Sequence, residues 1–207
     1  YLKFKYPQQF FLSLLKMSKH EPDSIGEISK IEKELTYFFN TSLTTGLVKL
    51  KTDSKAEWGT MTAKQMLLHL TQSSKMMHLE NTKLLIKEKY IEKAIAFLYT
   101  DKTISRGIEI PKDIGYNFDD GITEEIEQLK TELIDSTNNM LNFLTKNTDF
   151  RAVHPFFGEL NSEQWLLFQK KHYFYTIQKI QNQQVRLGLN QLTNNFIITK
   201  QSTMVHI

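Results

Sequence analysis

The 207-residue chain contains no cysteine. This absence excludes disulfides, thiolate metal sites and a cysteine nucleophile, and it fits the reducing environment of the cytoplasm. Glycine and proline are also scarce, with 8 and 4 residues, which leaves few positions for the tight turns of a strand-rich fold. We therefore expect a cytoplasmic, mainly helical protein that folds as one domain.

Long apolar runs and concentrated positive charge are missing as well. No run of about 18 apolar residues occurs, so a membrane-spanning helix is not expected. The 26 basic and 23 acidic residues are interleaved and give a formal charge of +3. Nucleic-acid recognition usually gathers Lys and Arg on one face, so no nucleic-acid partner is expected either. The chain begins with Tyr1, which leaves an upstream start and a removed signal peptide open.

The segment after Trp58 has the pattern of a capped helix. Thr62 and Gln65 form a capping box, in which each side chain accepts a hydrogen bond from the other residue's backbone N–H. The helix that follows places four residues on one face, at spacings of three and four: Met66, His69, Ser73 and Met76. His69 is therefore expected to point inward.

A second segment, residues 154–176, repeats this arrangement after a turn. Pro155 and Gly158 favour a change of chain direction, and Asn161 with Gln164 forms the next capping box. The apolar stripe of the following helix consists of Trp165, Phe168, His172 and Tyr175. His172 is thus a second histidine on a buried stripe.

The order of these motifs resembles the DinB/YfiT-like superfamily. Met-Leu-Leu-His at 66–69 is followed by His-Pro-Phe-Phe-Gly-Glu-Leu at 154–160 and by the Trp-to-Lys-His helix. The resemblance is closest to the branch with the His-Pro-x-Phe-Gly-x-Leu signature, a domain of unknown function, and it covers roughly residues 28–187. It implies an all-α fold, a DinB-like four-helix bundle in an up-down-down-up arrangement with a long crossover between the second and third helices.

Periodicity predicts where these helices lie. The first runs from Ser24 to about residue 50, and the second from residue 63 to 87 or 99. The third begins after Thr123, beyond an irregular connection at 100–121, and the fourth runs from Asn161 to about residue 187. Residues 1–22 form an N-terminal extension, 23–187 the bundle and 188–207 a C-terminal tail, in which 196–199 is either a strand or an extended segment.

The resemblance implies a divalent metal, zinc or nickel, held by three histidines. His69 matches the first ligand and His172 the second, but the third position is Thr176. Because the resemblance makes the two histidine-bearing helices neighbours, we expect the rings of His69 and His172 to lie within about 8 Å of each other, the reach of one shared ion. Water, a carboxylate or His154 are the alternatives for the third ligand, although capping backbone groups in the turn is the simpler role for His154. His78 lies nine residues after His69, about half a turn round the helix, and should not converge on the same point.

Two classes of function remain open. The resemblance implies a metal-dependent thiol transferase or hydrolase. A small-molecule substrate or thiol is the expected partner, and a homodimer is left open. The alternative is a metal-free, non-catalytic binding or stress-response bundle, in which His69 and His172 are buried histidines satisfied by hydrogen bonds. Glu80 and Glu159 are candidates for a general base only because they are acids near the motifs.

Overall fold

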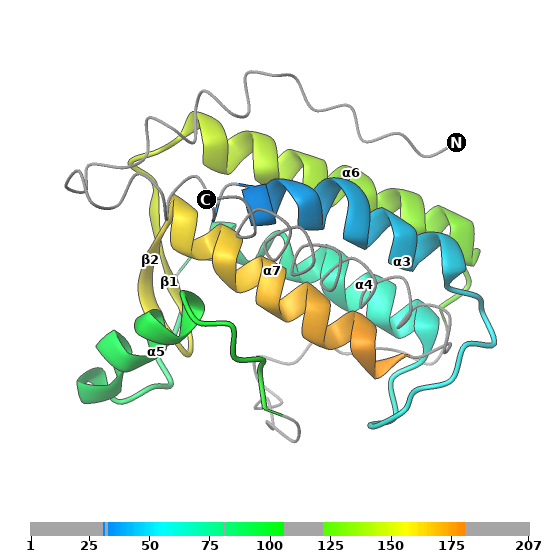
Figure 1. Ribbon diagram of the computed structural model, residues 1–207, viewed down its shortest axis with the longest axis horizontal. Helices are drawn as coiled ribbons and strands as arrows, with labels where there is room; N and C mark the ends of the chain where they lie inside the picture. The colour runs from blue at the N-terminus through cyan, green and yellow to red at the C-terminus, as the bar shows by residue number, and fades with distance from the viewer. Residues whose placement is uncertain (1–30, 32, 81, 106–121, 181–207) are drawn as a thin grey trace, which may run out of the picture.

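The computed structural model describes residues 31, 33–80, 82–105 and 122–180. Helices α3, α4, α6 and α7 lie side by side, and the two strands with α5 lie at one end of them (Figure 1). A π-helical stretch, Phe38–Ser42, leads directly into α3. The bounds within the described ranges are Leu43–Lys49 for α3, Ala63–Ser73 for α4, Ile91–Leu98 for α5, Ile126–Lys146 for α6, Arg151–His154 for β1, Gly158–Asn161 for β2 and Ser162–Lys179 for α7.

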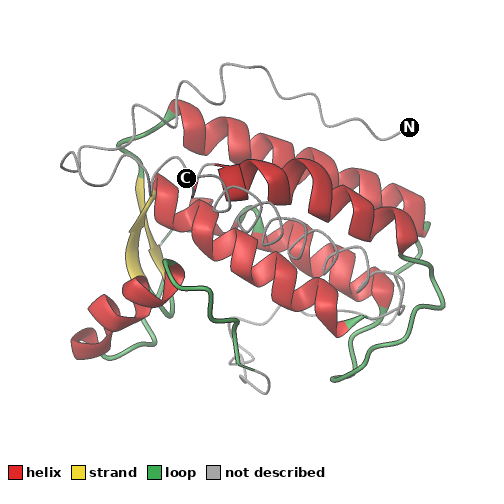
Figure 2. Ribbon diagram, in the orientation of Figure 1, coloured by secondary structure: helices red, strands yellow, loops and turns green. Residues whose placement is uncertain are grey.

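The prediction of an all-α bundle is wrong, because β1 and β2 form an antiparallel hairpin (Figure 2). The register runs from Arg151 opposite Asn161 to His154 opposite Gly158. Gly158 has φ +75°, a left-handed conformation that glycine adopts without steric cost and that lets the chain reverse after Pro155. The hairpin lies where the sequence predicted only a turn, and the chain is mixed rather than purely helical.

The predicted second helix is also shorter than expected. Helix α4 ends at Ser73, and the hydroxyl of Ser74 bonds the carbonyl of Thr71 in its last turn. A short 3₁₀ turn, Met76–His78, follows before the chain becomes extended at Leu79. The later part of the predicted helix is the separate helix α5, which packs against α7.

Both predicted capping boxes are confirmed. The Gln65 N–H donates to Thr62 Oγ1 over 3.2 Å, while the Thr62 N–H donates to Gln65 Oε1 over 2.8 Å. Asn161 and Gln164 make the equivalent two bonds, each 2.9 Å long. These caps satisfy N–H groups that a helix start otherwise leaves without partners, and each contributes about 1 kcal/mol. They therefore fix where the two histidine-bearing helices begin.

The other predicted bounds are met only in part. Helix α3 ends at Lys49, close to the end at about residue 50 that was expected for the first helix. The third helix was expected to begin directly after Thr123, but α6 begins at Ile126. Several predicted features lie outside the described residues: the helix start at Ser24, the N-terminal extension, most of the crossover, the last turns of the fourth helix, and the C-terminal tail with segment 196–199.

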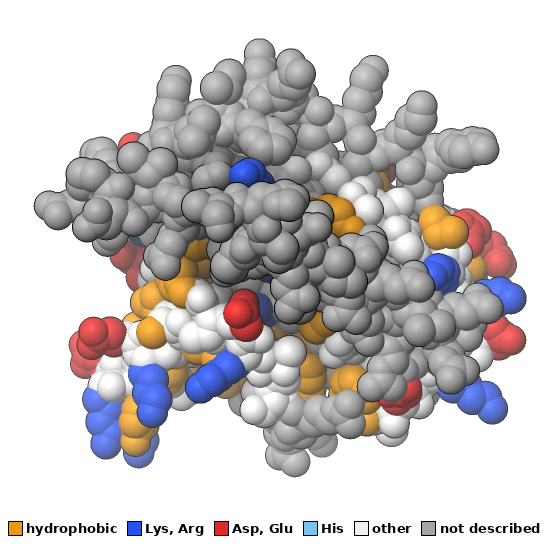
Figure 3. All heavy atoms as spheres, in the orientation of Figure 1, with side chains coloured by type: hydrophobic (Ala, Val, Ile, Leu, Met, Phe, Trp, Pro, Cys, Tyr) orange, Lys and Arg blue, Asp and Glu red, His pale blue; other side chains and the backbone are white. Residues whose placement is uncertain are grey.

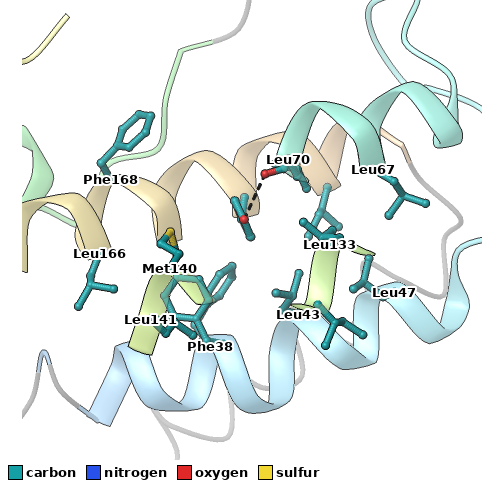
Figure 4. Packing of buried hydrophobic residues seen from close by; sticks show 14 of the residues in the cluster. Phe38, Leu43, Leu47, Leu67, Leu70, Leu133, Met140, Leu141, Leu166 and Phe168 are labelled. Carbon is teal, nitrogen blue, oxygen red and sulfur yellow. Dashed lines mark hydrogen bonds between the residues drawn. The ribbon is translucent and has the colours of Figure 1, made fainter. Parts of the chain in front are cut away.

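The core lies where α3, α4, α6 and α7 face one another, and Figure 4 shows side chains from these helices converging there. Trp165 and Tyr173 of α7 are both completely buried. Burying such side chains contributes about 1.5–3 kcal/mol each. The most buried aliphatic side chains include Leu43, Leu47, Met66, Leu67, Leu70, Leu133, Leu141, Leu144 and Leu166.

Several hydroxyl groups within this core are hydrogen-bonded to one another or to backbone carbonyls. The hydroxyl of Tyr173 donates to the carbonyl of Leu70 over 3.2 Å and lies 3.2 Å from the hydroxyl of Thr137. Ser74 and Ser136 are hydrogen-bonded between α4 and α6. Because unpaired buried polar groups cost free energy, these bonds favour one arrangement of α4, α6 and α7.

The surface carries mixed charge. On the face shown in Figure 3, the visible basic and acidic side chains are interspersed over the described elements rather than gathered by sign. Across the ranges that the structure describes, no helix combines the length and apolarity needed to cross a membrane.

Candidate functional site

His69 of α4 and His172 of α7 meet between their helices. Their Nε2 atoms are 2.9 Å apart, and their ring centroids are 4.9 Å apart with the planes at 79°. The His69 residue is buried, with 6% of its surface exposed, and His172 is half-buried. The predicted approach of the two rings is therefore confirmed, although 103 residues separate them in the sequence.

Ser73 and Gln169 support the second histidine of this pair. Ser73 lies one helical turn after His69, and its Oγ is 2.9 Å from His172 Nδ1. The same hydroxyl donates to Gln169 Oε1 over 3.1 Å, and Gln169 Nε2 donates to the backbone carbonyl of Ser73 over 2.7 Å. Gln169 has only 1% of its surface exposed, so these bonds replace the water that the amide would otherwise bind.

His154 contacts the same Phe168 ring as His172, but within the described residues no hydrogen bond joins it to the pair. Its Nδ1 accepts a 3.1 Å hydrogen bond from the backbone N–H of Phe156, which confirms the predicted capping role. The rings of Phe168 and Trp165 lie against it, with centroids 4.2 and 5.4 Å away. Burial lowers the pKa of His154 to about 3, so this imidazole is neutral at physiological pH.

Thr176 occupies the third position one helical turn beyond His172. The residue has 1% of its surface exposed, and its hydroxyl has no hydrogen-bond partner within the parts of the chain that the structure describes. Its neighbour Tyr175 instead packs its ring against Trp58, with centroids 6.2 Å apart. A buried hydroxyl is a weak donor for zinc compared with an imidazole, so Thr176 does not replace the missing histidine.

The two imidazoles are close to the spacing of metal ligands. Nitrogens about 2.1 Å from one ion lie about 3.4 Å apart at a tetrahedral angle and about 3.0 Å apart at a right angle. The observed 2.9 Å between His69 and His172 thus requires only a small opening. No cluster of three or more His, Cys, Asp or Glu side chains suited to a metal occurs among the described residues. Among the described residues, such an ion would have His69 and His172 as its imidazole ligands.

The remaining sequence candidates lie apart from the pair. His78 packs against Phe143, with ring centroids 4.6 Å apart, and does not join His69, as predicted. Glu80 and Glu159 are exposed, and within the described ranges neither hydrogen-bonds to the pair. The hydrogen bonds therefore do not favour either glutamate as a general base.

The sequence interpretation missed the role of Gln169. The helical spacing predicts Ser73 on the same face as His69 but assigns it no function, and it makes no prediction for Gln169. A signal was present, because Gln169 precedes His172 by three residues and so lies on the same face of the helix. A polar residue beside a buried histidine is a candidate for orienting its ring.

Comparison with family models, curated proteins and solved structures found no match for this chain. The side chains around the histidine pair are therefore the basis for assigning a function.

Proposed function

We propose that the protein is a metal-dependent thiol transferase or hydrolase of DinB-like type, in which His69 and His172 bind zinc or nickel. The observation that supports this proposal best is the 2.9 Å approach of the two Nε2 atoms. Imidazole nitrogens are good ligands for both ions, and the cysteine-free chain offers no thiolate of its own. When bound, the ion would lower the pKa of a coordinated thiol or water and so supply the nucleophile.

The chain's own residues bind and orient in this scheme. Ser73 contacts Nδ1 of His172 and so leaves its Nε2 directed at His69. Phe168 covers one face of the same imidazole and limits its rotation. The hydroxyl of Thr176, one turn further along α7, is a polar group for water or substrate at the third position. A small thiol is the substrate class that this arrangement favours, since it would complete a site to which the described residues contribute two strong ligands, His69 and His172.

Calorimetric titration of untagged protein with zinc and nickel tests the proposal. We expect one ion per chain, and we expect His69→Ala and His172→Ala each to abolish binding. His78→Ala is the matched control, because His78 packs against Phe143 away from the pair, and it should bind as the wild type does. A wild-type protein that binds neither ion, or a His69→Ala variant that binds equally well, would contradict the proposal.

A metal-free binding or stress-response protein is the second candidate. The direct hydrogen bond between the two imidazoles favours it, because that bond already satisfies the facing nitrogens of His69 and His172. Either function fits a cytoplasmic protein. Conjugation of a small thiol to an electrophile, measured with and without added zinc, separates the two. Metal-stimulated turnover that His172→Ala abolishes supports the enzyme, whereas absence of both metal binding and turnover supports the second candidate.

A further inference from the structure

The hydrogen bonds around Ser73 determine where the protons of the histidine pair lie. Gln169 Nε2 faces the backbone carbonyl of Ser73 at 2.7 Å, and a carbonyl only accepts hydrogen bonds. The amide is therefore oriented with its NH₂ group toward that carbonyl. Its oxygen, Oε1, is then the atom that faces Ser73 Oγ, at 3.1 Å.

The hydroxyl of Ser73 carries a single proton, which it donates to Gln169 Oε1. At its 2.9 Å contact with His172 Nδ1, the same oxygen must therefore accept. Nδ1 of His172 accordingly bears a proton. In a neutral imidazole Nε2 is then unprotonated, so it accepts the 2.9 Å hydrogen bond from the Nε2–H of His69.

We propose that Ser73 and Gln169 are positioning residues that hold His172 in its Nδ1–H tautomer, with the lone pair of Nε2 directed at His69. The two histidines consequently differ in tautomer, although they face each other through the same atom. The backbone carbonyl of Ser73 can only accept a hydrogen bond, and this constraint reaches His172 Nδ1 through three hydrogen bonds between α4 and α7.

A consequence for ligand binding rests on the proposed metal function. His172 is already in the tautomer that a ligand needs, because its Nε2 lone pair is available once the bond to His69 opens. His69 must first move its proton from Nε2 to Nδ1, with no net release of protons. His172 can therefore bind a metal without changing its tautomer. Ser73 accordingly contributes to metal affinity by fixing that tautomer, beyond the contribution of its packing.

Nuclear magnetic resonance of the histidine side chains tests the assignment directly. Long-range nitrogen–proton spectra of isotope-labelled, metal-free, full-length protein at mildly alkaline pH distinguish protonated from unprotonated ring nitrogens. We expect a protonated Nδ1 in His172 and a protonated Nε2 in His69, with the signals assigned from His172→Gln and His69→Gln variants. The opposite pattern in the wild type overturns the proposal, whatever the variants of Ser73 do.

Substitutions at Ser73 provide the second readout. Ser73→Ala should give His172 averaged signals of both tautomers, whereas Ser73→Thr keeps a hydroxyl and should restore the wild-type pattern. Ser74→Ala is the matched control, because it removes the adjacent buried hydroxyl, which bonds Thr71 and Ser136 rather than a histidine. An unchanged tautomer in Ser73→Ala, or an equal change in Ser74→Ala, counts against the positioning role.

Zinc titration separates this proposal from the proposed function. Ser73→Ala should weaken zinc binding by about 10- to 100-fold, the usual effect of losing a residue that orients a ligand. If wild-type protein shows the expected tautomers but binds no zinc, the metal function is wrong and the positioning role stands. If zinc binds at His69 and His172 but Ser73→Ala changes neither tautomer nor affinity, the positioning role is wrong and the metal function stands.

Discussion

Phe168 stacks on the imidazole of His172, with ring centroids 5.4 Å apart and ring planes only 13° from parallel. The same phenyl ring meets His154 of the hairpin at 4.2 Å. In Figure 4, Phe168 projects from α7 on the side opposite to Leu166, which points into the shared core. One aromatic side chain thus connects the hairpin to the histidine pair, and the hairpin that the sequence did not predict supports the candidate site.

Replacing Phe168 with leucine should therefore loosen His172 as well as the core. We expect a loss of about 1–3 kcal/mol in the free energy of unfolding, because the smaller side chain leaves space beside two imidazoles. We also expect broadened ring signals for His172 in the metal-free protein. Phe143→Leu is the control, since Phe143 packs against His78 in a similar aromatic contact away from the site. Equal broadening of His172 in both variants would argue against the support role of Phe168.

The two histidine-bearing helices could be predicted because their signals are local. Both capping boxes pair residues three apart, and the spacing of His69 and His172 on apolar stripes indicated that both rings point inward. These local patterns do not show that the two helices are neighbours; that expectation came from the resemblance, and the two Nε2 atoms lie 2.9 Å apart. Local patterns thus predicted the two histidines of the site and the helices that carry them.

The hairpin and Gln169 could not be predicted in the same way. Each strand has four residues, too few for alternation to distinguish a strand from a turn. The inward role of Gln169 depends on the Ser73 carbonyl, 96 residues away in the chain. Helix α4 stops at Ser73 although the apolar periodicity continues to Met76, and the next residue, Ser74, is hydrogen-bonded to Ser136 of α6, a distant contact that local patterns do not show.

His154 should make the protein sensitive to acid. Its pKa is about 3 in the folded state and 6.5 ordinarily, so the unfolded chain binds the proton more tightly. The stabilising contribution is complete above pH 6.5 and is lost as the pH falls toward 3. His154→Asn keeps an acceptor for the Phe156 N–H but does not titrate. Its unfolding free energy should depend less on pH in this window, by up to about 1.4 kcal/mol per pH unit.

Chemical denaturation of His154→Asn and wild type across this pH range measures the difference in slope. The variant should be less stable than wild type near neutral pH, because the amide fills less of the space between Phe168 and Trp165. His78→Asn serves as the control for replacing an imidazole with an amide at an exposed position. Parallel pH profiles for wild type and His154→Asn would show that His154 does not titrate on unfolding.

Gly158 should tolerate no side chain, because two effects oppose it. Its φ of +75° strains an L-residue, and an added Cβ would lie 2.9 Å from Cγ2 of Ile91 in α5. Gly59 is a matched control, with φ +79° but no atom within 4 Å of the added Cβ. Gly59→Ala should cost about 1 kcal/mol from backbone strain alone, and Gly158→Ala more.

A double variant separates the two effects at Gly158. Ile91→Ala removes the atoms that the new Cβ would meet, so it should cost less in the Gly158→Ala background than alone. Thermal unfolding of Gly158→Ala, Ile91→Ala, the double variant and wild type gives this coupling. Additive losses would mean that contact between the hairpin and α5 does not limit position 158.

Thr176→His should convert the two-imidazole site into a three-imidazole site. Position 176 is buried one turn beyond His172, and its present hydroxyl makes no hydrogen bond within the described part of α7 or its neighbours. A new imidazole there would face the same space as His69 if the α4–α7 packing holds. Zinc affinity should rise by at least about 10-fold, equivalent to about 1.4 kcal/mol, and zinc should raise the melting temperature with occupancy.

The double variant Thr176→His, His69→Ala shows whether the gain depends on the pair. If His69 belongs to the enlarged site, the double variant should lose most of the added affinity, because His172 and the new histidine alone again provide only two ligands. Thr71→His is the control. Thr71 is a buried threonine like Thr176 but lies in α4, where its hydroxyl donates to the Leu67 carbonyl, so this variant should not increase zinc affinity. Equal binding by wild type and Thr176→His would mean that position 176 does not face His69, leaving the pair as two histidines that satisfy each other by a hydrogen bond.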